Sequence, residues 1–522
     1  MKIKKFIRDL LNAYLFIKYN KKKFKKIYIN KKNIILIDQF NYHPSMIPYS
    51  YFVNILCKKY ESKAILYENY YRQNFFRRIF NFFKDMLPFS YFSVYKSFGI
   101  ERKFYTTFNE NIRYKASLAY FREIEKIKRK EDILKIKLEK VEIGELLYDF
   151  YLSINNIPTI NISEKRFKDA CMQFFLLFYF WHDYLNKNRN IKALIVSHDT
   201  YHYAIPLRIA IGLEIPCYTV AHGQCFFLDK QNIRKKTRFS EYNNEFNKLS
   251  SEIKKIGILK SQEILKQKFS GELTFDKANN EKVDVNLFSK NKTNINFSKK
   301  KKILVATHCF TDAIHAYGET LFTDFYDWID FVGKKTLNSD YQWLLKAHPA
   351  QYEKNLEHLK YFEKKYEKFL LLPKNISHFE LIDNNIIGVL TMYGSIGYEY
   401  PYFGIPVINA TNNNPHISYN FNYYPRSKDD YSKLIDDIEK LKFDKNKYRS
   451  EIYEYYFSNF LKDYYFFKDH IRTVEQLGEN YSSPLVYREW INNLSEKKDS
   501  EIKEKVKKFL DSKLHRFLKD NH

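Results

Sequence analysis

Short runs of apolar residues recur along the chain and are separated by polar turns and by segments with helical spacing. Seven of these runs are rich in Ile, Val and Leu and do not alternate with polar positions, which is typical of strands buried on both faces of a parallel sheet. They cover residues 34–37, 193–196, 217–220, 303–306, 343–346, 387–391 and 407–408. Strands that alternate with helical segments predict an α/β fold.

The same pattern occurs once in each half of the chain. Residues 193–223 predict a strand, a turn, a short helix ended by Gly212, and Pro216 before the next strand. Residues 386–410 repeat this order, with Gly404 and Pro406 in the corresponding places. Two such halves predict two doubly wound domains, in keeping with a length of 522 residues.

A polar segment separates the two halves and predicts the domain boundaries. Residues 269–300 have no long apolar run, so we expect a linker there between an N-terminal domain, 1–268, and a C-terminal domain, 301–480. Residues 63–129 carry clustered Phe, Tyr and Arg and predict a helical insertion in the first domain. Residues 481–522 predict basic C-terminal helices.

The formal net charge of +27 would suit an anionic partner such as a nucleic acid or a membrane. The lysines are spread along the chain and no nucleic-acid-binding motif accompanies them, so we expect no nucleic-acid partner. Residues 2–26 and 501–519 combine lysines with apolar residues at helical spacing. Such segments suit either an anionic membrane surface or a terminal helix with a solvated face.

Cysteine usage and the N-terminal sequence bear on location. The five cysteines have no metal-ligand spacing and indicate a reducing compartment. Lysines throughout the first 28 residues do not fit a signal peptide, and the longest apolar run, 174–181, is too short to span a bilayer. We expect a cytoplasmic protein, peripheral at the inner face of the cell membrane, without a required metal.

Residues that follow the predicted strands are candidates for chemistry, because parallel α/β sheets bind ligands outside the carboxyl ends of their strands. Histidines recur at these positions. The strand ends supply Asp38 with His43, His198 with Asp199, His222 with Gly223, His308 with Asp312, and His348. A single histidine is usually structural, but the repeated position indicates one common site.

The second half adds a predicted phosphate site. Gly394 and Ser395 open a helix after a strand, where small residues and the helix dipole favour a phosphate. Glu399 lies one turn later on the same face, either to accept hydrogen bonds from ribose hydroxyls or as an ordinary surface residue near a helix start.

Four segments of the second half resemble the nucleotide-binding domain of GT-B glycosyltransferases, especially the bacterial capsule-synthesis group that contains Kdo transferases. They are THCFTDAIH (307–315), FTDFYDWID (322–330), WLLKAHP (343–349) and YGSIGYEYPYFGIPVI (393–408). The sequence Gly-Ser-Ile-Gly departs from the commoner Gly-Ser-Ser. The resemblance implies two Rossmann-like domains that face each other across a cleft, with the terminal helices as additions.

The resemblance also implies a substrate and roles for residues. The donor would be a CMP-activated sugar such as CMP-Kdo or another ulosonic acid, used as co-substrate without a further cofactor. The acceptor would be a glycan or lipid-linked molecule of capsular polysaccharide or lipopolysaccharide synthesis. His348 and Ser395 would contact the CMP. The remaining donor-side residues are His308, Lys346, Pro349, Gly394 and Glu399.

Sugar transfer needs stabilisation of the departing nucleotide and, for inversion, a base that removes the acceptor proton. Candidates for the base are His222, Asp199 and Asp312, with His222 preferred because an imidazole is partly available as a base near neutral pH. His43, His198 and Gly223 are expected on the acceptor side.

Two other interpretations stay open. The chain also resembles CDP-glycerol glycerophosphotransferases, in which an HG turn, here His222 and Gly223, accompanies the HP pair. A polyol-phosphate transferase would leave phosphorus in its product. A degenerate, non-catalytic binding module is the third reading, and intact strand-end residues in both halves argue against it.

Overall fold

The computed structural model describes residues 2–24, 32–69, 75–221, 224–270, 275–276, 281–282, 287–290, 293, 295–348, 352–441, 443–462, 477, 481–512 and 514–518. The chain forms two compact units. Unit 1 comprises Met1–Leu147, Ile162–Ile233 and Asp463–His522, and unit 2 comprises Tyr148–Asn161 and Arg234–Lys462. Neither unit is one continuous segment of the chain.

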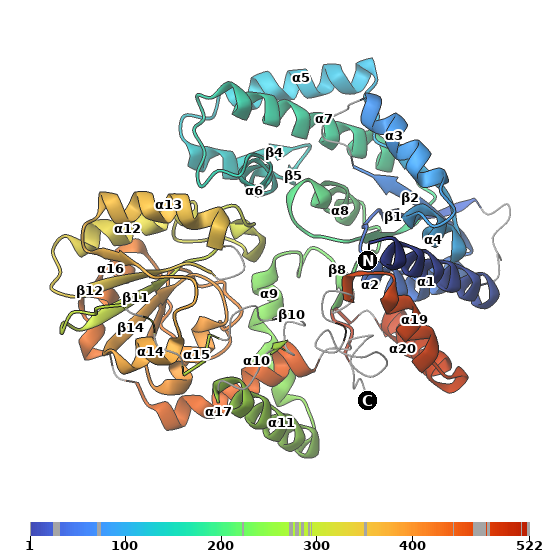
Figure 1. Ribbon diagram of the computed structural model, residues 1–522. Coiled ribbons are helices and arrows are strands. Elements are labelled where there is room, and N and C mark those ends of the chain that lie inside the picture. Colours follow the sequence, from blue (N-terminus) through green and yellow to red (C-terminus); the bar gives the residue numbers. More distant parts are fainter. Residues whose placement is uncertain are drawn as a thin grey trace. The chain divides into compact units, whose positions relative to one another are not determined.

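Unit 1 contains a six-stranded sheet in the order β3-β2-β1-β6-β7-β8 (Figure 1). All neighbouring strands are parallel except β8, which is antiparallel to β7. The strands are β1 (Asn33–Asp38), β2 (Ser62–Glu68), β3 (Ile100–Tyr105), β6 (Ile191–Val196), β7 (Cys217–Val220) and β8 (Cys225–Leu228). A short antiparallel pair, β4 (Lys137–Leu138) and β5 (Val141–Glu142), lies outside this sheet.

The helices of unit 1 come from both ends of the chain. They are α1 (Lys2–Lys23), α2 (His43–Lys59), α3 (Phe75–Met86), α4 (Tyr91–Ser97), α5 (Glu110–Ile124), α7 (Lys165–Lys187), α8 (Ala204–Gly212), α19 (Leu485–Asn493) and α20 (Glu496–Ser512). The C-terminal helices pack on α2, where Tyr51 Oη donates to Asp499 at 2.7 Å and the rings of Phe52 and Phe509 meet at 6.1 Å. Helix α6 (Gly144–Asn155) begins in unit 1 and ends in unit 2.

Unit 2 contains a five-stranded, fully parallel sheet in the order β13-β12-β11-β14-β15. Its strands are β11 (Lys302–Ala306), β12 (Gln342–Lys346), β13 (Phe369–Leu371), β14 (Ile386–Thr391) and β15 (Val407–Asn409). Its helices are α9 (Lys235–Ser240), α10 (Tyr242–Asn247), α11 (Ser251–Phe269), α12 (Phe325–Thr336), α13 (Tyr352–Lys365), α14 (His378–Asp383), α15 (Ile396–Phe403), α16 (Lys428–Asp436) and α17 (Lys445–Tyr456). The antiparallel pair β9 (Phe275–Asp276) and β10 (Glu281–Lys282) precedes β11.

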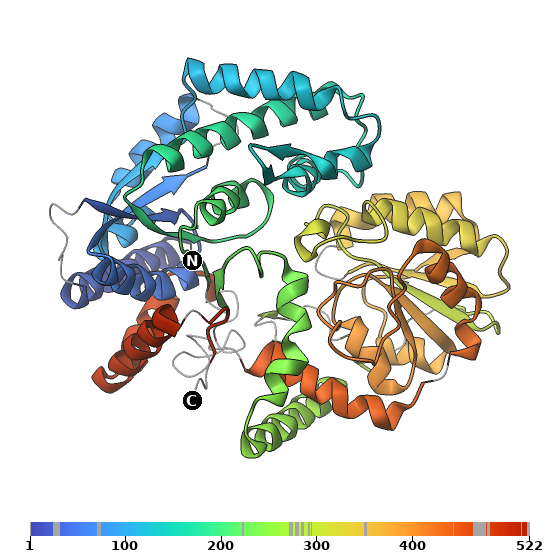
Figure 2. The same ribbon diagram turned by 180° about the vertical axis from the view of Figure 1, so that it is seen from behind.

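Each strand of this sheet is apolar on both sides because helices cover both faces. Ile303 and Val305 of β11 join a core with Trp328 of α12, whereas Leu304 joins a second core with Tyr400 of α15. Figure 2 shows α12 and α13 on one face of the sheet and α14 and α15 on the other. Burial on both faces explains why these strands lack an alternating pattern.

The structure confirms the α/β class and all seven predicted strands. In each sheet an early strand, β1 in unit 1 and β11 in unit 2, lies inside the sheet, and later strands are added on both sides of it. Each unit is therefore doubly wound. The chain has the two Rossmann-like units expected of a GT-B protein. The predicted cleft between two such units stays a prediction. Gly404 ends α15 in a left-handed conformation with φ 89°, as expected. Gly212 is the last residue of α8, also as expected, and the left-handed residue after this helix is Glu214, with φ 59°.

Two predictions about organisation differ from the structure. Residues 63–129 do not form a purely helical insertion, because they also supply β2 and β3 to the sheet of unit 1. The predicted boundaries at 268, 300 and 480 differ as well, since α11 and residues 148–161 belong to unit 2 while 481–522 belongs to unit 1. Compactness here depends on contacts between segments far apart in the chain, which local composition does not report.

Candidate functional site

The carboxyl ends of three neighbouring strands are tied together in unit 2. In the order β12-β11-β14, the direction of chain progression reverses between β11 and β14, the place where doubly wound sheets bind ligands. Thr391 Oγ1, at the end of β14, donates to the carbonyl of Ala306 at 3.3 Å. Thr307 N donates to the carbonyl of Lys346 at 2.9 Å. These bonds hold the ends of β14 and β12 against the end of β11.

Two imidazoles and a carboxylate gather at these ends. The rings of His308 and His348 lie 5.8 Å apart, and His308 Nδ1 is 3.6 Å from Asp312 Oδ2. Desolvation lowers the pKa of His308, opposed by Asp312. Although the side chain of His348 is exposed, its pKa is also lowered, by desolvation first and then by repulsion from His308 and Lys346. His348 is therefore neutral at pH 7 and can donate or accept a hydrogen bond.

Lys346 is the buried cation of this site. Its side chain is 5% exposed, and within the described part of the chain its Nζ has no hydrogen-bond or ion-pair partner. Burial lowers its pKa to about 8, opposed by the charge of Glu399. Glu399 is itself buried and pairs with Lys268 of α11 at 2.8 Å. The predicted ribose-binding role of Glu399 stays a prediction, and the structure gives this carboxylate a structural partner.

Helix α15 begins at this edge of the sheet, as predicted. Gly394 has a φ of 112°, which favours glycine, and a Cβ on it would meet no atom within 4 Å, so the space before the helix is open. Ser395 is the N-cap residue, but its side chain makes no capping hydrogen bond. A Cβ on Gly397 would lie 2.4 Å from the buried ring of His416. This close contact explains why residue 397 is a glycine.

A buried histidine–aspartate pair beside this site was missed by sequence reasoning. His315 Nδ1 lies 2.6 Å from Asp149 Oδ1, and His315 N donates to Asp149 Oδ2 at 3.2 Å. The buried Nε2 of His315 has no hydrogen-bond partner among the described residues. Tyr393 connects the pair to the strand ends, since its hydroxyl donates to the carbonyl of Ile314 at 3.1 Å. Asp149 lies on α6, 166 residues from His315, so no local signal could have paired them.

The switch point of unit 1 lies between β1 and β6 and carries a chain of three polar groups. Ser197 Oγ donates to Asp38 Oδ2 at 2.5 Å and lies 2.9 Å from His198 Nδ1. Asp38 is fully buried, and burial raises its pKa to about 7 despite the hydrogen bonds from Ser197. When Asp38 is ionised, this geometry makes His198 Nδ1 a donor to Ser197, which leaves Nε2 as the basic nitrogen. Asp38 was noted at a strand end, whereas Ser197 was not.

The other predicted residues of unit 1 are dispersed. Asp199 follows His198 and is half-buried. His43 begins α2, where its Nδ1 lies 2.9 Å from Tyr487 Oη and its ring stacks on Tyr91 at 4.5 Å. Burial lowers the pKa of His43 to about 4, so it is a neutral link between α2 and α19. The remaining predictions, His222, Gly223 and Pro349, lie outside the described residues.

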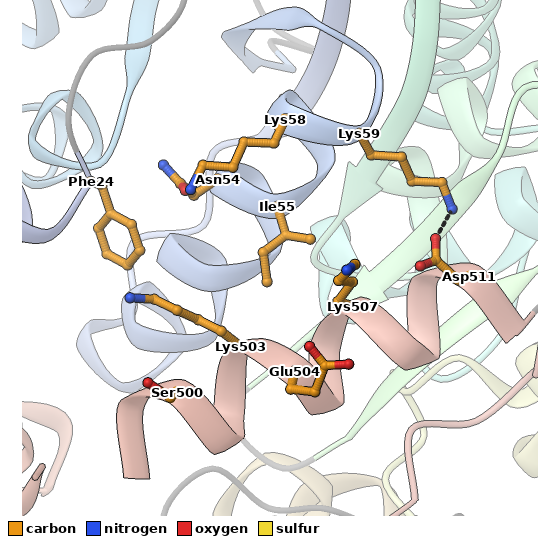
Figure 3. A pocket seen from close by; sticks show the side chains of 10 residues that line it. All are labelled: Phe24, Asn54, Ile55, Lys58, Lys59, Ser500, Lys503, Glu504, Lys507 and Asp511. Carbon is orange, nitrogen blue, oxygen red and sulfur yellow. Dashed lines mark hydrogen bonds and ion pairs between the residues drawn. The ribbon is translucent and has the colours of Figure 1, made fainter. Parts of the chain in front are cut away.

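Unit 1 also has a pocket of about 580 Å³ between α2 and α20 (Figure 3). Four lysines line it around Phe24 and Ile55. Two of them are already paired, Lys59 with Asp511 at 2.7 Å and Lys503 with Asp499 at 2.7 Å. None of the predicted site residues lines this pocket, so the strand ends remain the candidate site. No group of three or more His, Cys, Asp or Glu among the described residues is placed to hold a metal ion.

No family model and no curated protein matches the chain. Solved structures do match, at low similarity. The UDP-GlcNAc 2-epimerase from Neisseria meningitidis bound to UDP-GlcNAc is 10% identical, with 88% of this chain and 99% of that chain covered and a TM-score of 0.24. KpsC from Thermosulfurimonas dismutans, a beta Kdo 2,4 transferase, is 11% identical over 52% of this chain and 80% of that chain, with a TM-score of 0.32. A glycosyltransferase from Rickettsia africae is 10% identical over 92% and 99%, with a TM-score of 0.23. TM-scores this low carry no argument about activity, and the description of the fold rests on the two sheets themselves.

Proposed function

We propose that the chain is a glycosyltransferase that takes its sugar from a nucleotide-activated donor and binds the nucleotide at the strand ends of unit 2. The observation that carries this proposal is Lys346, a buried cation without a partner in the described part of the chain. A buried unpaired charge is costly unless a ligand of opposite charge meets it. The phosphate of a nucleotide sugar is such a ligand, and the start of α15 favours the same charge.

The chemistry follows from the protonation states. With a pKa of about 8, Lys346 is mostly charged at neutral pH and stabilises the phosphate as the departing nucleotide gains charge. The neutral His348 supplies a hydrogen bond beside it. For the base, the strand ends of unit 1 support His198, whose tautomer is set through Ser197 by Asp38. Asp199, His222 and Asp312 remain the alternatives for this role.

The finer proposal concerns the substrates. The resemblance of residues 343–349 and 393–408 to capsule-synthesis enzymes supports a CMP-linked ulosonic acid such as CMP-Kdo as donor. It supports a glycan or lipid-linked acceptor of capsular polysaccharide or lipopolysaccharide synthesis, used at the cytoplasmic face of the membrane. A polyol-phosphate transferase that uses CDP-glycerol is the rival within the same architecture.

A thermal-shift panel tests the donor site. We expect CMP to raise the melting temperature of the purified chain more than CDP, UDP or GDP, and His348→Ala to abolish this rise. His182→Ala is the matched control, since His182 is half-buried on α7 and belongs to unit 1, whereas the proposed donor site belongs to unit 2. A larger response to CDP or UDP would overturn the CMP assignment. No response to any nucleotide would overturn the proposed activity and favour a non-catalytic module.

The reaction class is tested by following phosphorus. CMP-Kdo labelled with ³²P in its single phosphate keeps the label on the released CMP in sugar transfer. Transfer of the label from CDP-glycerol labelled in its β-phosphate to the product, with release of unlabelled CMP, would instead identify a polyol-phosphate transferase.

A further inference from the structure

Helix α3 of unit 1 exposes an apolar face to solvent. Phe76, Phe80 and Phe83 are 78%, 67% and 63% exposed, and they lie on one side of the helix at spacings of three and four residues. Other exposed apolar side chains of this segment are Ile79, Phe82, Met86 and Leu87. Isolated exposed apolar residues are normal on proteins, but a contiguous patch of aromatic side chains marks an interaction surface.

The fold itself holds this face outward. The opposite side of α3 is polar and is attached to the sheet, because Asp85 accepts hydrogen bonds from Lys103 Nζ at 2.6 Å and from Tyr105 Oη at 3.1 Å. Lys103 also pairs with Glu68 at the end of β2, at 2.6 Å. A small polar cavity of about 30 Å³ lies under the helix at these strand ends. An ordinary surface helix turns its apolar side inward, so α3 is inverted.

Helix α1 extends the surface. Its side toward the core is apolar, with Phe16 and Ile17 buried, yet a second apolar row lies in solvent. The exposed row of α1 is Ile3, Phe6, Ile7, Leu11, Tyr14 and Leu15. The ring of Tyr14 meets that of Phe89, just after α3, at 6.3 Å, and both α1 and α3 contact α4. Figure 1 shows α4 between α3 and α1. The contact of Tyr14 with Phe89 connects the exposed row of α1 to the end of α3.

The charged residues around the exposed apolar rows of α1 and α3 indicate which kind of partner these rows bind. The acidic residues of the two helices are Asp9, which lies 3.7 Å from Arg8 Nε, and Asp85, which is paired with Lys103. Exposed lysines remain on both helices, among them Lys4, Lys5, Lys18 and Lys84. Aromatic and aliphatic side chains interspersed with lysines fit the boundary of an anionic bilayer, where each cation adds to the electrostatic attraction. Among the described residues, no helix is long and apolar enough to cross a membrane.

We propose that the exposed faces of α1 and α3 dock unit 1 onto the surface of an anionic phospholipid bilayer, with the phenylalanines of α3 inserted at the level of the headgroups. This docking does not depend on the proposed transfer reaction. It does bring the bilayer next to the carboxyl ends of β2 and β3, because Asp85 joins α3 to Lys103 and Tyr105 there, and Lys103 pairs with Glu68.

Vesicle sedimentation tests the proposal with the full chain. We expect the chain to co-sediment with vesicles of phosphatidylcholine and phosphatidylglycerol, and to bind vesicles of phosphatidylcholine alone much more weakly. In the variant Phe80→Ser/Phe83→Ser, partitioning to the anionic vesicles should fall about tenfold or more, because two inserted aromatic side chains are lost. Raising the ionic strength should weaken binding of both proteins.

The control pair lies on α5 of the same unit. Tyr114 and Phe121 are 65% and 64% exposed, as much as Phe80 and Phe83, so Tyr114→Ser/Phe121→Ser matches the loss of apolar surface. This variant should bind vesicles as the unmodified chain does. Equal melting temperatures would show that both variants fold.

Four results would overturn the proposal. Three concern vesicles: undiminished binding by Phe80→Ser/Phe83→Ser, equal binding to neutral and anionic vesicles, and an equal loss in the α5 control. The fourth is self-association that depends on Phe80 and Phe83 without vesicle binding, which would assign the face to a second copy of the chain. If the chain does not dock on vesicles, nucleotides would still raise its melting temperature and His348→Ala would still abolish that rise. Failure of docking is therefore distinguishable from failure of the proposed function.

Discussion

Burial has shifted the protonation of single residues at both sheets, and the shift at Asp38 makes folding depend on pH. The ordinary pKa of this carboxyl is 3.8, and burial between β1 and β6 raises it to about 7. The folded chain therefore binds this proton more tightly than the unfolded chain. The stabilisation is fully present below pH 3.8 and is lost as the pH rises through about 7.

Replacement of Asp38 by Asn removes this dependence. The quantity to measure, by urea denaturation, is the unfolding free energy of Asp38→Asn minus that of the unmodified chain. We expect this difference to increase by about 3 kcal/mol between about pH 4 and about pH 8. Asp340→Asn, at an exposed carboxyl, should show no such trend. A flat difference for Asp38→Asn would mean that the carboxyl titrates normally in the folded chain.

For single residues, the sequence predicted which side chains lie at the strand ends but not which side chains they contact. His308, Lys346, His348 and Ser395 were found because each follows a recognisable strand. The pairing of Lys268 with Glu399, and that of Asp149 with His315, joins segments that meet only after folding. Such contacts leave no periodicity in the chain, so reasoning from strand ends could not identify them.

Helix α15 begins at the proposed donor site, and Gly397 lets it pack closely on His416. A Cβ at this position would lie 2.4 Å from His416 Cε1 and 2.6 Å from His416 Nδ1, and the histidine is buried. We expect Gly397→Ala to destabilise the chain by about 1–3 kcal/mol, because neither the helix nor the ring can give way without strain. Displacement of α15 should also weaken nucleotide binding, measured by calorimetric titration.

The control for this substitution is Gly212→Ala in α8. A Cβ there would meet no atom within 4 Å, and the residue is helical and exposed. Its stability should be unchanged or higher by a few tenths of a kcal/mol. Equal stability of the two variants would contradict the packing argument.

Elements were predictable where burial covers both faces of a strand. All seven apolar runs are strands for this reason. Strand β3 was missed because it lies at the edge of the sheet, where Glu101 and Arg102 face solvent and interrupt the apolar pattern. Strand β2 was absorbed into the same predicted insertion, although its sequence, SKAILYE, is buried along most of its length.

For the whole molecule, the C-terminal segment acts as a structural part of unit 1. Phe509 of α20 is buried between Phe52 and Phe517, with ring distances of 6.1 and 5.2 Å. We expect Phe509→Ala to destabilise unit 1 by about 3–5 kcal/mol. Hydrogen exchange should accelerate in α2 and α20, while β11, β12 and β14 of unit 2 keep their protection. Equal acceleration of hydrogen exchange in both units would contradict the division of the chain into two compact units.

The domain boundaries were the least predictable property, because each unit gathers segments that are distant in the chain. The polar stretch 269–300 is a reasonable linker by composition. Nevertheless, Phe269 and Phe288 within it pack against each other at 4.9 Å and belong to the core around Tyr398. The composition of a segment indicates how exposed that segment is. The unit to which it belongs depends instead on its packing against residues far away in the sequence.

The discontinuous make-up of unit 1 has a consequence for synthesis on the ribosome. Every residue of unit 2 precedes position 463, so this unit can complete its core while later residues are still being translated. Unit 1 begins first but finishes last, since α2 gains its contacts with α20 only after that helix emerges from the exit tunnel. During translation, unit 1 therefore stays incomplete while unit 2 can already be folded.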